Sequence, residues 1–229
     1  LVAQAAGAAR EPYTRKGLLA GSCFRSMFSS VLRAVDLEPD ATLAQLSAVS
    51  GTKLRLYTVD ADRFELVVLS SESHPDLEAW RAVHMSAAYP LMFEPAYFEG
   101  RVYVDGGILC NFPITQCLDE AGDEGRSEVL CLRLPTGVAC EPLSPESDAS
   151  THAERIVAGL VSVACPDAAL PEGVACLELP SAASGRAQRI IGAVSSKADR
   201  RALAEEGRAA ARDFLLLHCS DGEPTGSAA

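Results

Sequence analysis

The residues best suited to chemistry are Asp105, Gly106 and Gly107, which follow the apolar-alternating stretch 101–104. A carboxylate at the end of a strand can act as a general base when a nucleophile lies within hydrogen-bond reach. The same triplet is also a strong turn signal, because aspartate and glycine both tolerate positive φ. Taken alone, the triplet therefore predicts a structural turn, and a catalytic interpretation needs support from the residues around it.

The flanking residues supply that context. Residues 88–95 read A-x-P-x-x-F-x-P, residues 103–107 end in D-G-G, and residues 111–113 read N-x-P. This block resembles the second signature block of the patatin-like lipid acyl hydrolases. Residues 16–21, followed by a helical pattern, look like the family's preceding segment, so the resemblance extends from about residue 16 to about residue 217.

The resemblance implies a serine–aspartate dyad, in which a serine on a G-x-S-x-G turn attacks an ester and an aspartate activates it. Asp105 matches that aspartate, Gly106 and Gly107 would let the backbone come close to the nucleophile, and Asn111 either braces the loop or forms an ordinary Asx turn. A free aspartate has a pKa of about 3.9, so the dyad requires direct contact and shelter from water. This chemistry needs no metal or other cofactor.

The chain departs from the family by containing no G-x-S-x-G. Residues 125–129 (GRSEV) fail at the last position, and the family's glycine-rich oxyanion loop is also absent. Cys110 and Ser86 lack the strand–turn–helix setting that exposes a nucleophile. Because residue 1 is Leu, we expect the chain to be the C-terminal part of a longer domain, with both elements upstream, and to be inactive by itself.

Composition limits the kinds of partner. A formal net charge of -11 argues against nucleic acid and against electrostatic recruitment to anionic membranes. No apolar run approaches the roughly 20 residues of a membrane-spanning helix, and no secretory signal is visible, so we expect a cytoplasmic protein. Peripheral membrane contact is expected only from the lipid substrates that the resemblance implies. The eight cysteines form no C-x-x-C pair, which favours buried free thiols, and the four scattered histidines predict no metal site.

The pattern of elements predicts an α/β fold, a three-layer α/β/α sandwich with a mostly parallel sheet whose N-terminal part is missing. We expect one patatin-like domain over 1–218 and a disordered tail over 219–229. A Thr151-x-x-Glu154 capping box predicts the start of one helix. Strands are expected at 53–59, 64–69, 101–104, 128–134 and 174–179, and helices after Phe24, Ser73 and Thr151 and over 198–217.

Three functional hypotheses follow. In the first, the complete protein is a lipid acyl hydrolase of the phospholipase A or lipase type, acting on lipid or phospholipid esters. In the second, the chain is a non-catalytic remnant that binds lipid or a protein partner. In the third, Asp-Gly-Gly is a plain turn in an unrelated domain. Four side chains near the block either line an acyl pocket or, more commonly, belong to the core: Trp80, Met85, Phe93 and Tyr97.

Overall fold

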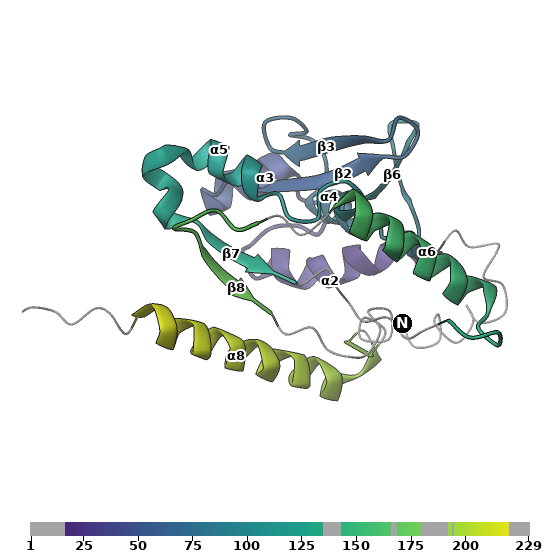
Figure 1. Cartoon of the computed structure of the whole chain (residues 1–229). Helices are drawn as coiled ribbons and strands as arrows, with labels where there is room; N and C mark the ends of the chain where they lie inside the picture. Colours follow the sequence, from purple (N-terminus) through teal and green to yellow (C-terminus); the bar gives the residue numbers. More distant parts are fainter. Residues whose placement is uncertain (1–16, 135–142, 166–168, 180–191, 194, 220–229) are drawn as a thin grey trace, which may run out of the picture. The chain divides into compact units, whose positions relative to one another are not determined.

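Helices and strands are interspersed along the chain, which confirms the α/β class (Figure 1). The computed structural model describes residues 17–134, 143–165, 169–179, 192–193 and 195–219. They fall into two compact units, one of Leu1–Asn111 with Leu143–Pro166 and one of Phe112–Pro142 with Asp167–Ala229. The expected tail lies outside the described residues, apart from Cys219. The single domain over 1–218 stays a prediction.

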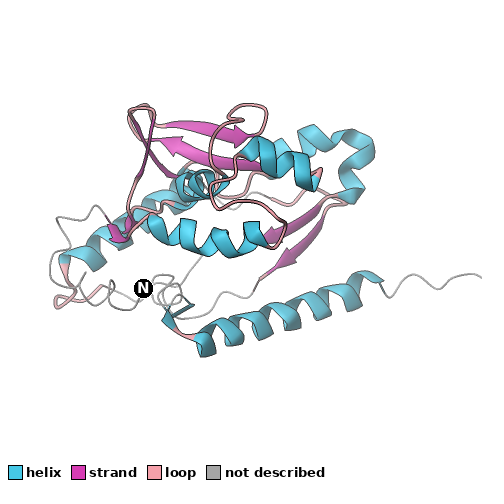
Figure 2. Ribbon diagram, turned by 180° about the vertical axis from the view of Figure 1, so that it is seen from behind, coloured by secondary structure: helices cyan, strands magenta, loops and turns pink. Residues whose placement is uncertain are grey.

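The first unit contains a four-stranded antiparallel sheet (Figure 2). Its strands, in spatial order, are β3 (Glu65–Ser70), β2 (Arg55–Asp60), β6 (Arg101–Asp105) and β5 (Ala96–Phe98). Short turns join β2 to β3 and β5 to β6, and strands joined in this way run antiparallel. The expectation of a mostly parallel sheet therefore fails for this sheet. In the described part of this unit, parallel pairing is confined to β1 (Gly17–Leu19) and β4 (Leu91–Phe93).

The turn between β2 and β3, which separates the two strands expected at 53–59 and 64–69, is built around Asp60. Its carboxylate accepts the N–H groups of Asp62 at 3.0 Å and Arg63 at 3.2 Å and pairs with Arg101 at 3.1 Å. Burial opposes ionisation of Asp60, but the two N–H groups and the guanidinium outweigh it and lower the pKa of this carboxyl. The turn is thus specified by one side chain.

Helix α4 (Ala79–Ala87) packs against β2 and β6, and α2 (Ser22–Arg33) packs against α4. Two further helices belong to this unit, α3 (Leu43–Ser50) and α6 (Ala149–Ala164). The core lies beneath α4, so the helix that leads into the A-x-P block is firmly anchored. Its buried members are Leu43, Leu69, Leu77, Ala79, Ala82, Met85, Ala96 and Tyr103.

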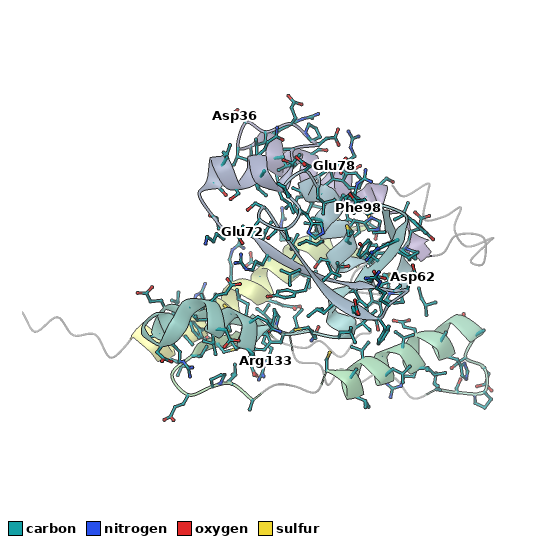
Figure 3. All side chains as sticks on the ribbon, turned by 90° about the horizontal axis from the view of Figure 1, so that it is seen from above. Asp36, Asp62, Glu72, Glu78, Phe98 and Arg133 are labelled. Carbon is teal, nitrogen blue, oxygen red and sulfur yellow. The ribbon has the colours of Figure 1, made fainter. Side chains whose placement is uncertain are left out.

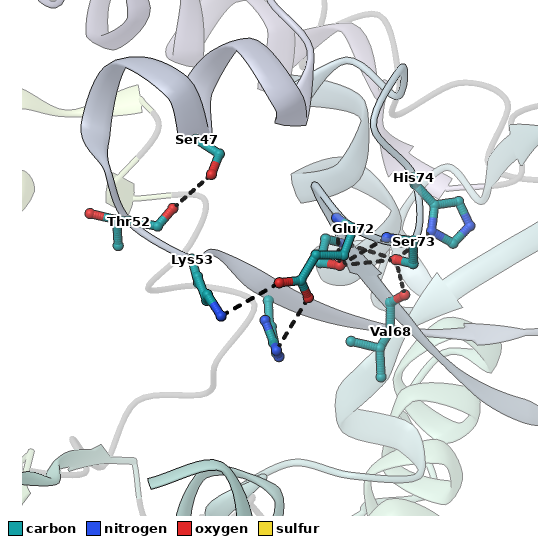
Figure 4. A network of polar contacts seen from close by, with 9 residues as sticks. Ser47, Thr52, Lys53, Val68, Glu72, Ser73 and His74 are labelled. Atoms are coloured by element: carbon teal, nitrogen blue, oxygen red, sulfur yellow. Dashed lines mark hydrogen bonds and ion pairs between the residues drawn. The ribbon is translucent and has the colours of Figure 1, made fainter. Parts of the chain in front are cut away.

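Serine side chains delay the start of α4 beyond the expected position near Ser73 (Figure 4). The Ser73 hydroxyl accepts the N–H of Ser70 at 3.0 Å and donates to the Val68 carbonyl at 2.9 Å. The Ser70 hydroxyl accepts the N–H groups of Glu72 at 3.2 Å and Ser73 at 3.1 Å. These local bonds hold the chain in a turn, so the helix begins only at Ala79.

The second unit is built on a parallel pair of strands. Its elements are α5 (Ile114–Gly125), a 3-10 turn η2 (Arg126–Glu128), β7 (Leu130–Arg133), β8 (Ala175–Glu178) and α8 (Lys197–Cys219). Arg133, labelled in Figure 3, pairs with Glu178 on the neighbouring strand and lies 5.8 Å from the centre of the Phe112 ring. Buried Ile114, Leu118 and Cys131 form the core between α5 and β7.

The free thiols are Cys23, Cys110, Cys117, Cys131, Cys165 and Cys176. Cys131 and Cys165 are buried, and burial is the main cause that raises the pKa of Cys131. Cys117 is exposed, so the expectation of buried thiols holds for only part of the set. Within the described residues, no three His, Cys, Asp or Glu side chains converge in a way that would hold a metal ion.

Candidate functional site

Asp105 ends strand β6 and begins the 3-10 turn η1 (Gly106–Ile108). Its Oδ1 accepts the N–H of Gly107 at 2.7 Å, which fixes the orientation of the carboxylate. Its backbone N–H donates to the carbonyl of Ala88 at 3.1 Å, and Ala88 is the fully buried residue that follows α4. The half-buried carboxylate is therefore held from two sides, by its own turn and by the end of α4.

Close approach of the backbone requires glycine at position 106 and leaves little room for a side chain at position 107. A Cβ on Gly106 would lie 2.2 Å from the carbonyl oxygen of Tyr57, on the neighbouring strand β2. A Cβ on Gly107 would lie 3.0 Å from Asp105 Oδ1 and 3.1 Å from Asn111 Oδ1. Neither glycine adopts positive φ. The sequence argument from positive φ was therefore wrong for this turn. The close approach seen at Gly106 is to strand β2, and the expected approach to a nucleophile stays a prediction.

The remaining predicted site residue, Asn111, lies beside the aspartate loop. Its Oδ1 is close to Gly107, and the side chain is exposed. The loop between them is closed by the N–H groups of Leu109 and Cys110, which donate to the Gly106 carbonyl at 3.1 and 2.9 Å. The structure thus brings Asp105, both glycines and Asn111 together in one turn. The bracing role of Asn111 stays a prediction.

Thr58 is a supporting residue that the sequence did not reveal. It is fully buried, lies opposite Asp105 in the β2–β6 ladder, and places its hydroxyl 2.8 Å from the carbonyl oxygens of both Met85 and Val104. Its hydroxyl therefore connects β2 to α4 through Met85 and to β6 through Val104, the residue before Asp105. A threonine in a strand is so common that the sequence carries no signal for this role.

We expect Thr58→Val to lower the free energy of unfolding by about 1–3 kcal/mol, because it removes a buried donor while preserving side-chain volume. Thr58→Ser, which keeps the hydroxyl, is the matched comparison for that bond. Urea unfolding followed by circular dichroism measures both. An unchanged free energy of unfolding in Thr58→Val would contradict the prediction, because this variant keeps the methyl and loses only the hydroxyl.

A cleft of about 530 Å³ opens beside the other end of α4. His84 lies at its base, 8% exposed, with Nε2 at 2.8 Å from the carbonyl oxygen of Glu94 and its ring stacked on Phe24. Because a carbonyl only accepts, Nε2 carries the hydrogen. Trp80 and Tyr97 line the cleft, whereas Met85 belongs to the core. The remaining lining residues are Gly21, Ser22, Arg25, Arg81, Glu94, Pro95 and Ala96.

His84 makes stability depend on pH. Burial lowers its pKa below the ordinary 6.5, against the opposing effects of the Glu94 carbonyl and carboxylate, while Arg81 adds to the lowering. The unfolded chain then binds the proton first, so the free energy of unfolding falls as pH drops below about 6.5. We expect His84→Gln to reduce this slope in urea titrations between about pH 5 and 8. Unchanged slopes would assign the dependence to other groups.

A family model described as patatin-like phospholipase matches residues 2–118, which include the Asp105 loop and the whole four-stranded sheet. The chain belongs to the patatin-like phospholipase family. This patatin-like chain is 24% identical over 98 residues to the probable lipid hydrolase 463L of Invertebrate iridescent virus 6, covering 43% of this chain and 34% of the viral protein. It is 42% identical over 48 residues to uncharacterized protein R571 of Acanthamoeba polyphaga mimivirus, covering 21% and 16% of the two chains.

Among solved structures, VipD from Legionella pneumophila aligns with the patatin-like chain at a TM-score of 0.46 and 19% identity, over 79% of this chain and 36% of VipD. The alignments therefore span about a third of the length of 463L and of VipD. The described residues include no helix both long and apolar enough to cross a membrane.

Proposed function

We propose that the complete protein hydrolyses acyl esters of lipids, with Asp105 as the general base of a serine that this chain does not contain. Family membership supports a lipid ester as substrate. The observation that carries the proposal is the fixed carboxylate, held by the Gly107 N–H at 2.7 Å and by the Asp105 backbone bond to Ala88. A base on a rigid turn is what nucleophile activation without histidine requires.

The proposed reaction proceeds in two displacements. The serine oxygen attacks the ester carbonyl while Asp105 takes the hydroxyl proton, and the alcohol leaves with that proton. Water then attacks the acyl-serine while Asp105 takes one of its protons, and that proton passes to the serine oxygen as the fatty acid is released. Gly106 and Gly107 keep the turn narrow, so that the nucleophile can approach the carboxylate. The steps require no metal or cofactor, and this chain supplies only the base.

The absence of G-x-S-x-G in this chain keeps one alternative open, a patatin-like remnant that binds lipid or a protein partner without catalysis. The two proposals differ in the nucleophile. A fluorophosphonate probe, which labels activated serines, and a soluble p-nitrophenyl ester together test for it.

We expect the complete natural protein to be labelled and to hydrolyse the ester, and a variant with its G-x-S-x-G serine changed to alanine to do neither. The 229-residue chain alone is expected to be unlabelled and inactive. A complete protein that lacks both labelling and hydrolysis would reject the hydrolase and favour the binding remnant.

A further inference from the structure

Helix α6 carries an exposed apolar stripe. Ile156, Leu160 and Val163 are 60%, 64% and 81% exposed, and their spacing places them on one side of the helix. No charged residue occurs from 156 to 164. Large apolar side chains that remain together in solvent mark a surface that contacts something else.

The C-terminal end of α6 is attached to the candidate site. Cys165, which caps the helix and is buried, donates from its Sγ to the carbonyl of Ile108 at 3.4 Å. Ile108 ends the 3-10 turn that begins after Asp105. The apolar stripe therefore leads toward the turn that carries the proposed base.

The charged residues of α6 and its polar cap lie at its opposite end. Asp148 caps the helix by accepting the N–H of Thr151 at 2.8 Å, and the helix's two charged residues, Glu154 and Arg155, lie in the first half. The helix is thus polar where it begins and apolar where it reaches the site. A helix with this polarity can lay its apolar half on a lipid surface while its first turn stays in water.

We propose that the stripe of Ile156, Leu160 and Val163 docks on a zwitterionic lipid surface and brings that surface to the Asp105 turn. This inference rests on the proposed lipid substrate. The apolar half of α6 offers no cation for an anionic headgroup, and the net charge of -11 opposes anionic membranes. Neutral phosphatidylcholine is therefore the matching surface.

The test is co-sedimentation of the chain with phosphatidylcholine vesicles and with vesicles in which part of the lipid is phosphatidylserine. The chain should bind the neutral vesicles more tightly. The double variant Ile156→Gln/Leu160→Gln should bind them about tenfold more weakly or worse, because it removes two apolar side chains from the contact.

A matched control exists on α2, where Met27 and Val31 have the same spacing and are 59% and 60% exposed. Met27→Gln/Val31→Gln should bind like the unchanged chain. Absence of vesicle binding, equal loss in both double variants, or tighter binding to the anionic vesicles would overturn the proposal. So would light scattering that shows a dimer broken only by the α6 variant, since a second copy would then cover the stripe.

The vesicle assay needs no catalysis, which separates this inference from the proposed function. If vesicle binding depends on α6 but the complete protein fails to hydrolyse esters, the lipid contact is supported and the hydrolase is rejected. Hydrolysis of a soluble ester without α6-dependent vesicle binding would support the hydrolase and reject the lipid contact.

Discussion

Asp105→Asn in the complete protein is expected to lower kcat for a soluble ester by about 100-fold to 10,000-fold, the usual contribution of a general base. An amide cannot take the serine proton. Its oxygen can still accept the Gly107 N–H, now 2.7 Å from Asp105 Oδ1, so the turn is retained. The loss should therefore appear in turnover, with little change in the urea midpoint.

The matched control is Asp62→Asn. Asp62 is an exposed acid in the β2–β3 turn, labelled in Figure 3, and its change alters the net charge by the same amount. Its activity should stay within about twofold of the unchanged protein, since surface substitutions have small effects. Full activity in Asp105→Asn would identify the D-G-G turn as purely structural and reject Asp105 as the base.

Gly106→Ala is expected to cost at least about 3 kcal/mol of stability or to prevent folding. The new Cβ would lie 2.2 Å from the Tyr57 carbonyl oxygen and 2.5 Å from its carbon. Both are backbone atoms of β2, so no side chain can rotate away. Relief requires β2 and β6 to separate at the position where Thr58 joins them.

Gly207→Ala in α8 is the comparison for that change. Nothing lies within 4 Å of a Cβ there, so alanine should raise stability by about 0.5–1 kcal/mol through helix propensity. Urea midpoints and soluble yield measure both variants. A Gly106→Ala chain with a native midpoint would show that the two strands do not approach as closely as described.

Local patterns predicted much of the first unit. The alternation over 53–69 gave a hairpin that is observed within about two residues, because each strand and its turn are specified by neighbouring residues. Helix α3 was missed although its signals are local. Thr42 and Gln45 form a capping box, and Gly51 ends the helix with φ 65°. The helix has only eight residues between these caps, which is too short for a helical period to stand out.

The predicted start of α6 was displaced for a similar reason. Two capping signals compete, and the chain uses Asp148 in place of the Thr151 box. Strands β4 and β5 have only three residues each, too few for a period to show. The pairing of β5 with β6 in the antiparallel sheet and of β4 with β1 in parallel depends on how these short strands pair.

In the candidate site, too, the residues that form one local block were predicted and the residues that support them from elsewhere in the chain were not. Asp105, Gly106, Gly107 and Asn111 lie within seven residues, and a sequence block identifies them. Their support comes from far along the chain. Thr58 contacts Val104, 46 residues away in the sequence, and Met85, 27 residues away, and a single sequence contains no signal for such contacts.

The meeting of β2, α4 and β6 at Thr58 also has an entropic consequence. The Asp105 turn loses its conformational freedom when the chain folds, because a buried hydroxyl and the end of α4 hold it. An arriving ester therefore does not have to order the proposed base. The free energy of its binding remains available to align the carbonyl with the nucleophile.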